Sequence, residues 1–271
     1  MKSRIKRLGY LLKKVNTQPI FRVPNFIGLY KDPTFDLGTG TTRWGFMYSV
    51  PDGNLAPSIS FTLAKSSFPN PLSLKDYITR ARTEQIPTLG QRVKLAVSLS
   101  MTFAMLHSAG WLHKGFSSRT VWFFSPLKGR GQNPPALDNP YLTGFNSSRP
   151  SNDESLERNQ IGNQYWLHPD TSQGFTKILD LYSLGVALLE IGLWYPATGR
   201  VPKEHQESAE AFHEYLSTKT VKELGFRTGL LYQEVMETLL TCNFPSDVDD
   251  ETLTREFFQR VLHQLLKISV D

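Results

Sequence analysis

Apolar and polar positions alternate along the chain with two different periods, which predict a small part containing strands and then a mainly helical part. Residues 3–16 carry apolar side chains every three or four positions, as in an amphipathic helix. Strand-like runs follow at residues 21–30 and 41–50, with a turn-rich segment between them. The sequence "PDGN" at residues 51–54 then interrupts the pattern and predicts a boundary between the two parts.

The longest apolar stripe of the second part predicts a helix from Thr88 to about His107. Thr88 and Gln91 have capping-box spacing, in which each side chain accepts from a free backbone N–H of the other residue. Gly110 suits the left-handed conformation that ends many helices. The other predicted elements are a short helix at 72–82, a hairpin of 120–124 with 140–145, a polar loop at 146–176, and helices from 177 and near 203–217, 227–241 and 250–268. This order predicts an α+β fold.

Composition narrows the class of protein. The chain has 271 residues, of which 39% are hydrophobic, enough to bury a substantial core. The most apolar stretch, Ile178 to Trp194, contains Asp180 and Glu190, which favours a buried core helix over a membrane span. Cys242 is the single cysteine, so an internal disulfide is excluded. We expect a cytoplasmic protein in which Cys242 packs inside an apolar helix.

Basic residues crowd the start of the chain, and no acidic residue precedes Asp32. The cations are Lys2, Arg4, Lys6, Arg7, Lys13 and Lys14. They suit either a patch for an anionic surface or the solvated face of an ordinary helix. We expect no nucleic-acid partner, since no aromatic residues alternate with the charges as a stacking platform requires. An anionic membrane remains an alternative partner.

The segment from Trp111 to Phe124, "WLHKGFSSRTVWFF", lies where several predicted elements meet. A long helix, Gly-x-x-His, a short loop, a hairpin, a polar segment and an apolar helix follow one another in that order. From about Leu89 to Leu193 this order resembles the protein-kinase fold. The resemblance implies a kinase-like α+β protein with a reduced, strand-containing N-lobe at 1–53 and a helical C-lobe at 54–271. If Met1 is the true start of the protein, half of a kinase ATP site is absent, and if it is not, the missing strands could lie upstream.

The catalytic loop of protein kinases reads H-R-D-L-x-x-x-N. Laid on this pattern, His113 matches the histidine and Lys114 replaces the arginine. Gly115 stands at the position of the catalytic aspartate, and Thr120 at that of the metal-binding asparagine. The resemblance therefore implies a loop whose position is kept and whose catalytic groups are absent.

The kinase motifs that follow the catalytic loop also keep structural residues and lack a catalytic one. In the D-F-G motif, Gly144 replaces the aspartate that holds magnesium, while Phe145 is kept. Asp170 resembles the acidic end of the A-P-E motif. Asp180 resembles the aspartate of the central helix that accepts hydrogen bonds from the backbone of the catalytic loop. A carboxylate in so apolar a helix needs such donors. The resemblance implies structural roles for Asp170 and Asp180.

Two longer motifs point to a particular group of kinase-like domains. Residues Leu106–Phe124 and Pro140–Pro150 ("PYLTGFNSSRP") are similar to motifs of fungal kinase-like domains that follow HeLo-type prion-inhibition-and-propagation domains. In that family the kinase-like part is regarded as a signalling or control module for a membrane-active helical bundle. The resemblance implies that the partner is another protein or such an upstream helical domain.

These observations predict an inactive pseudokinase that serves as a protein-interaction or regulatory module, in fungal signalling or cell-death control. The alternative is an atypical, active protein kinase with a substituted catalytic acid. We predict no metal and no cofactor, although a nucleotide held without metal remains open. Four serines of the polar segment could be phosphorylated or could be ordinary loop residues: Ser147, Ser148, Ser151 and Ser155.

Overall fold

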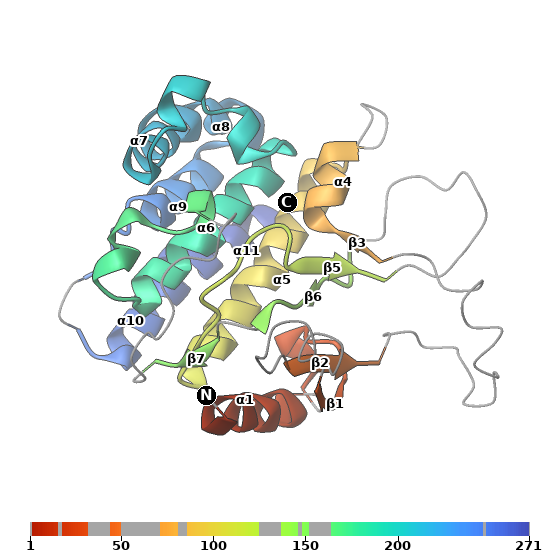
Figure 1. Cartoon of the computed structure of the whole chain (residues 1–271). Coiled ribbons are helices and arrows are strands. Elements are labelled where there is room, and N and C mark those ends of the chain that lie inside the picture. Colours follow the sequence, from red (N-terminus) through yellow and green to blue (C-terminus); the bar gives the residue numbers. More distant parts are fainter. Residues whose placement is uncertain are drawn as a thin grey trace, which may run out of the picture.

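The computed structural model describes residues 2–15, 18–31, 44–49, 71–80, 86–124, 137–145, 148–151, 164–245 and 248–270. In these residues the fold is α+β, with short antiparallel sheets beside a large group of helices (Figure 1). The α+β class predicted from the hydrophobic pattern is therefore confirmed. The boundary predicted at residues 53 and 54 lies outside the described residues.

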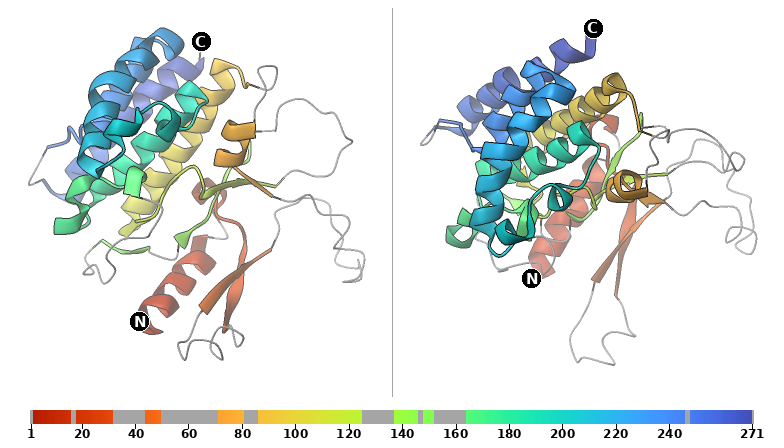
Figure 2. Two further views of the ribbon diagram at one scale, coloured as in Figure 1. Left: turned by 45° about the horizontal axis from the view of Figure 1, so that its top comes forward. Right: turned by 90° about the horizontal axis from the view of Figure 1, so that it is seen from above.

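The N-terminal part consists of one helix on one hairpin. α1 (Lys2–Val15) is followed by a 3-10 turn, η1 (Pro19–Phe21), and by strands β1 (Phe26–Lys31) and β2 (Trp44–Tyr48), which pair antiparallel. Leu8 and Leu12 on α1 share the hydrophobic core with Phe26 of β1. Figure 2 shows α1 lying beside the hairpin. The strand predicted at 21–30 starts later, because Pro19 begins the 3-10 turn.

Backbone and side-chain hydrogen bonds join this part to the rest of the molecule. The Leu142 N–H donates to the Arg22 carbonyl at 2.6 Å, and the Thr102 hydroxyl donates to the Ile20 carbonyl at 3.2 Å. The Arg22 guanidinium also donates to the Asn139 side chain at 3.1 Å. The segment after α1 is thus docked on the helical part.

The predicted hairpin forms, and two further pairings accompany it. β5 (Val121–Phe123) pairs antiparallel with β6 (Tyr141–Leu142), and β3 (Leu72–Ser73) lies on the other side of β5. The helix predicted at 72–82 therefore loses its first two residues to β3, and α4 (Leu74–Arg80) follows. β4 (Trp111–Leu112) pairs with β7 (Arg149–Pro150), and β7 lies inside the segment predicted as a loop.

The helical part is built around α6 (Lys177–Leu193). Every residue from Asp180 to Trp194 is buried, as expected of a core helix. α5 (Leu89–Ser108) begins with the predicted capping box, in which the Thr88 N–H donates to the Gln91 side chain at 2.9 Å and the Gln91 N–H to the Thr88 hydroxyl at 3.3 Å. Gly185 lets α6 approach α9 (Leu230–Leu240) closely, since a Cβ there would lie 2.8 Å from the Leu239 Cβ.

Short helices complete the structure. They are η4 (Gln164–Trp166), η5 (Pro169–Gln173), η6 (Ala197–Gly199), η7 (Lys203–His205), α7 (Ala209–Tyr215), the π-turn η8 (Leu216–Thr220), α8 (Val221–Thr228), α9 (Leu230–Leu240), α10 (Asp250–Phe257), the π-turn η9 (Phe258–Leu262) and α11 (His263–Val270). The helix predicted from 203 begins at Ala209, where the Ser208 side chain caps it. α8 lies mostly between two predicted helices, and the helix predicted at 227–241 begins as α9 after Gly229, which has φ +84°.

The prediction for Cys242 was wrong in its placement. α9 ends at Leu240, and Cys242 follows it with φ +50°, outside any helix. Its thiol is free and only partly buried, and burial raises its pKa to about 12. A thiol with so high a pKa carries little thiolate at neutral pH, which agrees with the expected packing role.

Candidate functional site

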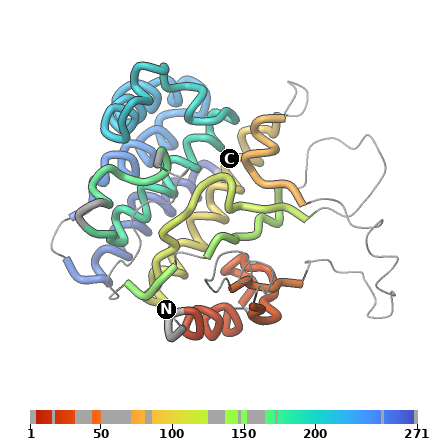
Figure 3. Tube along the Cα trace, viewed as in Figure 1, coloured from red at the N-terminus to blue at the C-terminus, as the bar shows by residue number. Residues whose placement is uncertain are grey.

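The loop at residues 113–120 connects two short strands. α5 ends at Ser108, and Gly110 turns the chain with φ +72°, a conformation that suits glycine. The chain then passes through β4 and the loop into β5 (Figure 3). Because β4 pairs with β7 and β5 pairs with β6, both ends of the loop are fixed by antiparallel pairing.

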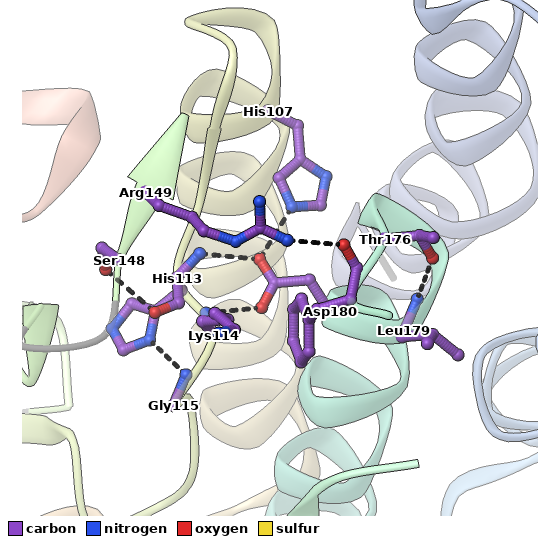
Figure 4. A network of polar contacts seen from close by, with 10 residues as sticks. His107, His113, Lys114, Gly115, Ser148, Arg149, Thr176, Leu179 and Asp180 are labelled. Carbon is purple, nitrogen blue, oxygen red and sulfur yellow. Dashed lines mark hydrogen bonds and ion pairs between the residues drawn. The ribbon is translucent and has the colours of Figure 1, made fainter. Parts of the chain in front are cut away.

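The first turn of α6 places a carboxylate against this loop. The backbone N–H of His113 donates to one Asp180 oxygen at 2.8 Å, and that of Lys114 to the other at 2.9 Å. The His107 Nε2 lies 3.0 Å from the oxygen that His113 contacts (Figure 4). The Asp180 side chain is fully buried. Asp180 therefore lies where the kinase resemblance places it, holding the backbone of the loop.

These donors keep Asp180 charged. Burial by itself would raise the pKa of this carboxyl. The hydrogen bond from His107, the nearby histidines and the Lys114 N–H outweigh burial and hold the Asp180 pKa below its ordinary value. Hydrogen bonds to an ionised acceptor are stronger than neutral ones. The loop is thus anchored by a buried carboxylate.

His113 is fully buried and bridges two backbone groups. Its Nε2 lies 2.8 Å from the Thr143 carbonyl oxygen and must donate to it, while its Nδ1 accepts from the Gly115 N–H at 3.4 Å. These partners assign a neutral imidazole with its proton on Nε2. The ring packs against Phe145 at 5.0 Å and Phe116 at 5.6 Å between centroids. Burial lowers the His113 pKa.

Acidification below about pH 6.5 is expected to destabilise the protein. Burial lowers the pKa of His113, His168 and His213 from the ordinary value of 6.5. As the pH falls, the unfolded chain binds these protons first. Stabilisation that is complete above pH 6.5 is therefore lost as the pH approaches the lowered values. The expected slope is up to about 1.4 kcal/mol per pH unit for each histidine, measured by urea unfolding between about pH 7.5 and pH 5.5.

His113→Gln separates this histidine from the other two. A glutamine side chain can still donate to the Thr143 carbonyl but does not titrate. The variant is expected to be less stable at neutral pH and to show a shallower loss of stability on acidification. An unchanged slope, or a protein that becomes more stable from pH 7.5 to 5.5, would contradict a neutral His113.

The next two positions of the loop carry no carboxylate. Lys114 has φ +67°, and its ammonium lies 5.8 Å from the centre of the Phe175 ring, at the segment that leads into α6. Gly115, at the position of the catalytic aspartate, is buried. The loop therefore has its backbone held by Asp180 and offers no acid at Gly115.

Thr120 uses its side chain to close the loop. Its hydroxyl donates to the Ser117 carbonyl at 2.9 Å and accepts from the Ser117 N–H at 3.1 Å. Its carbonyl accepts from the Thr143 N–H at 2.8 Å and from the Thr143 hydroxyl at 3.0 Å. The hydroxyl at the asparagine position is thus committed to the loop itself.

Gly144 lies directly against Thr120. It has φ +81°, and a Cβ there would lie 2.5 Å from the Thr120 Cγ2 and 3.6 Å from the His113 ring. Phe145, next in the chain, is buried against His113. The structure therefore brings His113, Thr120, Gly144 and Phe145 together, and the Thr120 methyl occupies the space that a side chain at position 144 would need.

Two residues of this network were missed or misread from the sequence. Arg149 is buried and donates to the Phe175 carbonyl at 3.0 Å. Ser148, considered above as a phosphorylation site, is fully buried and donates to the His113 carbonyl at 2.9 Å. A kinase cannot reach a hydroxyl in that position without opening the loop. In the sequence, Ser148 and Arg149 were marked solely by their place in the "SRP" end of the second motif. Ser147 and Ser155, the other serines considered, lie outside the described residues.

Comparison with known protein families gives a match over most of the chain. Residues 52–264 match a domain of unknown function, DUF7580. The chain belongs to the DUF7580 family. The matched region contains the loop, Asp180 and every other residue of the network described above, whereas α1, β1 and β2 precede it. The search of curated proteins found no match.

Within the DUF7580 domain, Asp170 differs from Asp180. Its side chain is 66% exposed, and its carboxylate lies 3.6 Å from His168 Nδ1. The His168 ring in turn packs edge-on against Tyr182 of α6 and His213 of α7. Asp170 therefore lies at the surface of η5, whereas Asp180 lies inside the core.

Two further features of the DUF7580 domain bear on ligands. A cavity of about 570 Å³ borders His107 and Lys177, and the Lys177 ammonium lies 2.7 Å from an Asp250 oxygen at its edge. Among the described residues, no three His, Cys, Asp or Glu side chains gather as ligands for a metal ion. In that same part of the chain, no helix combines the length and the apolar character needed to cross a bilayer.

Proposed function

We propose that this chain is a catalytically inactive, protein-kinase-like domain that acts as a protein-interaction or regulatory module. One observation carries the proposal. Asp180 holds the backbone of the loop, while the positions that the kinase resemblance assigns to the reacting groups hold Gly115, Thr120 and Gly144. The kinase-like fold and the inactive state are both part of the proposal.

The contacts of the loop support kinase-like architecture. Asp180, at the start of a buried central helix, accepts two backbone N–H groups of the loop. His113 is bonded to the carbonyl of the residue before Gly144 and packs on Phe145. These contacts join segments that are far apart in sequence and that occur in the order of the kinase motifs.

The chemistry of the same positions supports inactivity. A positioned general base contributes about 10²–10⁴-fold in rate, and phosphoryl transfer also depends on metal ions that neutralise charge. Gly115 and Gly144 supply no carboxylate, and the Thr120 hydroxyl is bonded within the loop. The carboxylate bonded to the loop backbone, Asp180, is saturated by donors and buried, so it does not replace the missing acid.

The helical core supports a regulatory role. The helices around the buried helix α6 form a packed core, on which surface loops and short helices can present contacts to a partner. The similarity of two motifs to fungal kinase-like domains suggests a protein partner, in signalling or the control of cell death. An upstream helical domain is the partner that this similarity favours.

ATP, with or without Mg²⁺ or Mn²⁺, is expected to leave the melting temperature unchanged. A ligand at about 100 times its dissociation constant would stabilise the folded state by about 2.7 kcal/mol, so a thermal-shift titration would detect a functional site. Each metal alone, and ADP in place of ATP, are the controls that separate metal from nucleotide binding. A shift that needs metal would favour the alternative of an active kinase with a substituted acid. A metal-independent shift would make the domain a nucleotide-binding pseudokinase.

A further inference from the structure

The outer face of α1 is a continuous basic surface with one aromatic ring at its centre. We propose that this face docks on a lipid bilayer with anionic headgroups. The inference goes beyond the regulatory role proposed above and does not depend on it. We call the surface the basic stripe, and it consists of Lys6, Arg7, Tyr10, Lys13 and Lys14.

The charge of the chain is divided unevenly between its two parts. Residues 1–31 contain eight of the 30 Lys and Arg and none of the 25 Asp and Glu. The remaining residues therefore contain 22 basic and 25 acidic side chains and are slightly acidic. A molecule with this distribution is steered so that its N-terminal part meets an anionic surface.

Helical geometry gathers the cations on one side. Lys6 and Lys13 lie at one edge of the exposed face, and Arg7 and Lys14 at the other, within an arc of about 120° and a length of about 12 Å. All four residues are exposed. The opposite side of α1 buries Leu8, Leu12 and Val15 in the contact with the hairpin. The helix can therefore lie on a surface with its basic face without losing its own packing.

Tyr10 lies between the two pairs of cations. Its side chain is 64% exposed, and the Lys14 ammonium lies 4.8 Å from the centre of its ring. Tyrosine is enriched at the level of lipid headgroups, where its ring meets apolar chains and its hydroxyl meets water. Because the apolar residues of α1 are already buried, we expect shallow and salt-sensitive binding rather than insertion.

The same face fits nucleic acid less well. Sequence-specific recognition combines the arginines and lysines that contact bases and phosphate with amide or acidic side chains, and binding of single strands uses several stacking rings. Among the described side chains of α1, residues 5–15, the exposed ones are lysine, arginine and one tyrosine. A flat, anionic surface needs only these charges and the ring.

Binding of the full chain to vesicles tests the proposal. We expect it to co-sediment with vesicles of phosphatidylcholine that contain about a third phosphatidylserine, and not with phosphatidylcholine alone. Raising the salt from about 0.05 M to about 0.5 M should release it. The variant K6Q/R7Q/K13Q/K14Q keeps good helix formers and should bind at least about a hundredfold more weakly, since each cation contributes about fivefold.

A matched variant controls for net charge. K203Q/K219Q/K222Q/R227Q also removes four exposed cations, which lie around η7, η8 and α8, away from α1 in Figure 1. This control should bind like the wild type, and Tyr10→Ala should bind more weakly than the wild type. Equal loss in both quadruple variants, or no binding at low salt, would overturn the proposal. Tighter salt-sensitive binding to duplex DNA or RNA than to the vesicles would also overturn it. None of these results affects the ATP titration.

Discussion

Replacement of Asp180 by alanine is expected to lower the free energy of unfolding by about 3–5 kcal/mol. The carboxylate accepts from His107 and from the backbone N–H groups of His113 and Lys114, and all of these contacts are in the core. Its removal leaves several buried donors without an acceptor and frees the loop. Thermal unfolding should show a fall of about 10 °C in the melting temperature for a chain of this size.

Asp170→Ala is the matched control, because the kinase resemblance assigns structural roles to both aspartates. The Asp170 side chain is 66% exposed, so its removal should change stability by less than about 0.5 kcal/mol. Asp180→Asn keeps the shape and one acceptor oxygen and should fall between the two. If Asp180→Ala were as mild as Asp170→Ala, the carboxylate would not be the anchor of the loop.

The long helices and the main features of the site could be predicted because their signals are local or are ordered along the chain. The capping box of Thr88 and Gln91 fixes the start of α5 within four residues of sequence. Asp180 stands out because a charge in an apolar helix needs partners. The order of the motifs then placed His113 and Phe145 beside one another.

The features that could not be predicted depend on contacts across space. β7 is two residues long and pairs with β4 some 38 positions earlier, which no hydrophobic period records. Burial of Ser148 and Arg149 follows from that pairing, so a segment that reads as polar contributes to the core. Gly229 has a positive φ that ends α8 just before α9, inside the stretch predicted as one helix at 227–241. In each case tertiary contact or backbone conformation outweighed the local pattern.

Gly144→Ala is expected to cost about 2–4 kcal/mol, the second large effect. Part of this cost, about 1 kcal/mol, comes from placing alanine at φ +81°. The rest comes from the new Cβ, which would lie 2.5 Å from the Thr120 Cγ2. Gly110→Ala is the control for the first part alone, since Gly110 has φ +72° and no atom within 4 Å of a Cβ. Urea unfolding of both variants measures the difference.

Thr120→Ser tests the second part, because serine lacks the Cγ2 atom and keeps the hydroxyl that closes the loop. In this background the cost of Gly144→Ala should fall toward that of Gly110→Ala, since the residue 120 Cβ at 3.1 Å remains as a milder contact, which gives a coupling energy of about 1–3 kcal/mol. Costs that simply add would mean that Thr120 does not fill this space. Coupling would mean that a side chain at position 144 is disfavoured while Thr120 remains. Under the proposed kinase resemblance, the glycine at 144 and the threonine at 120 would then be one structural feature rather than two.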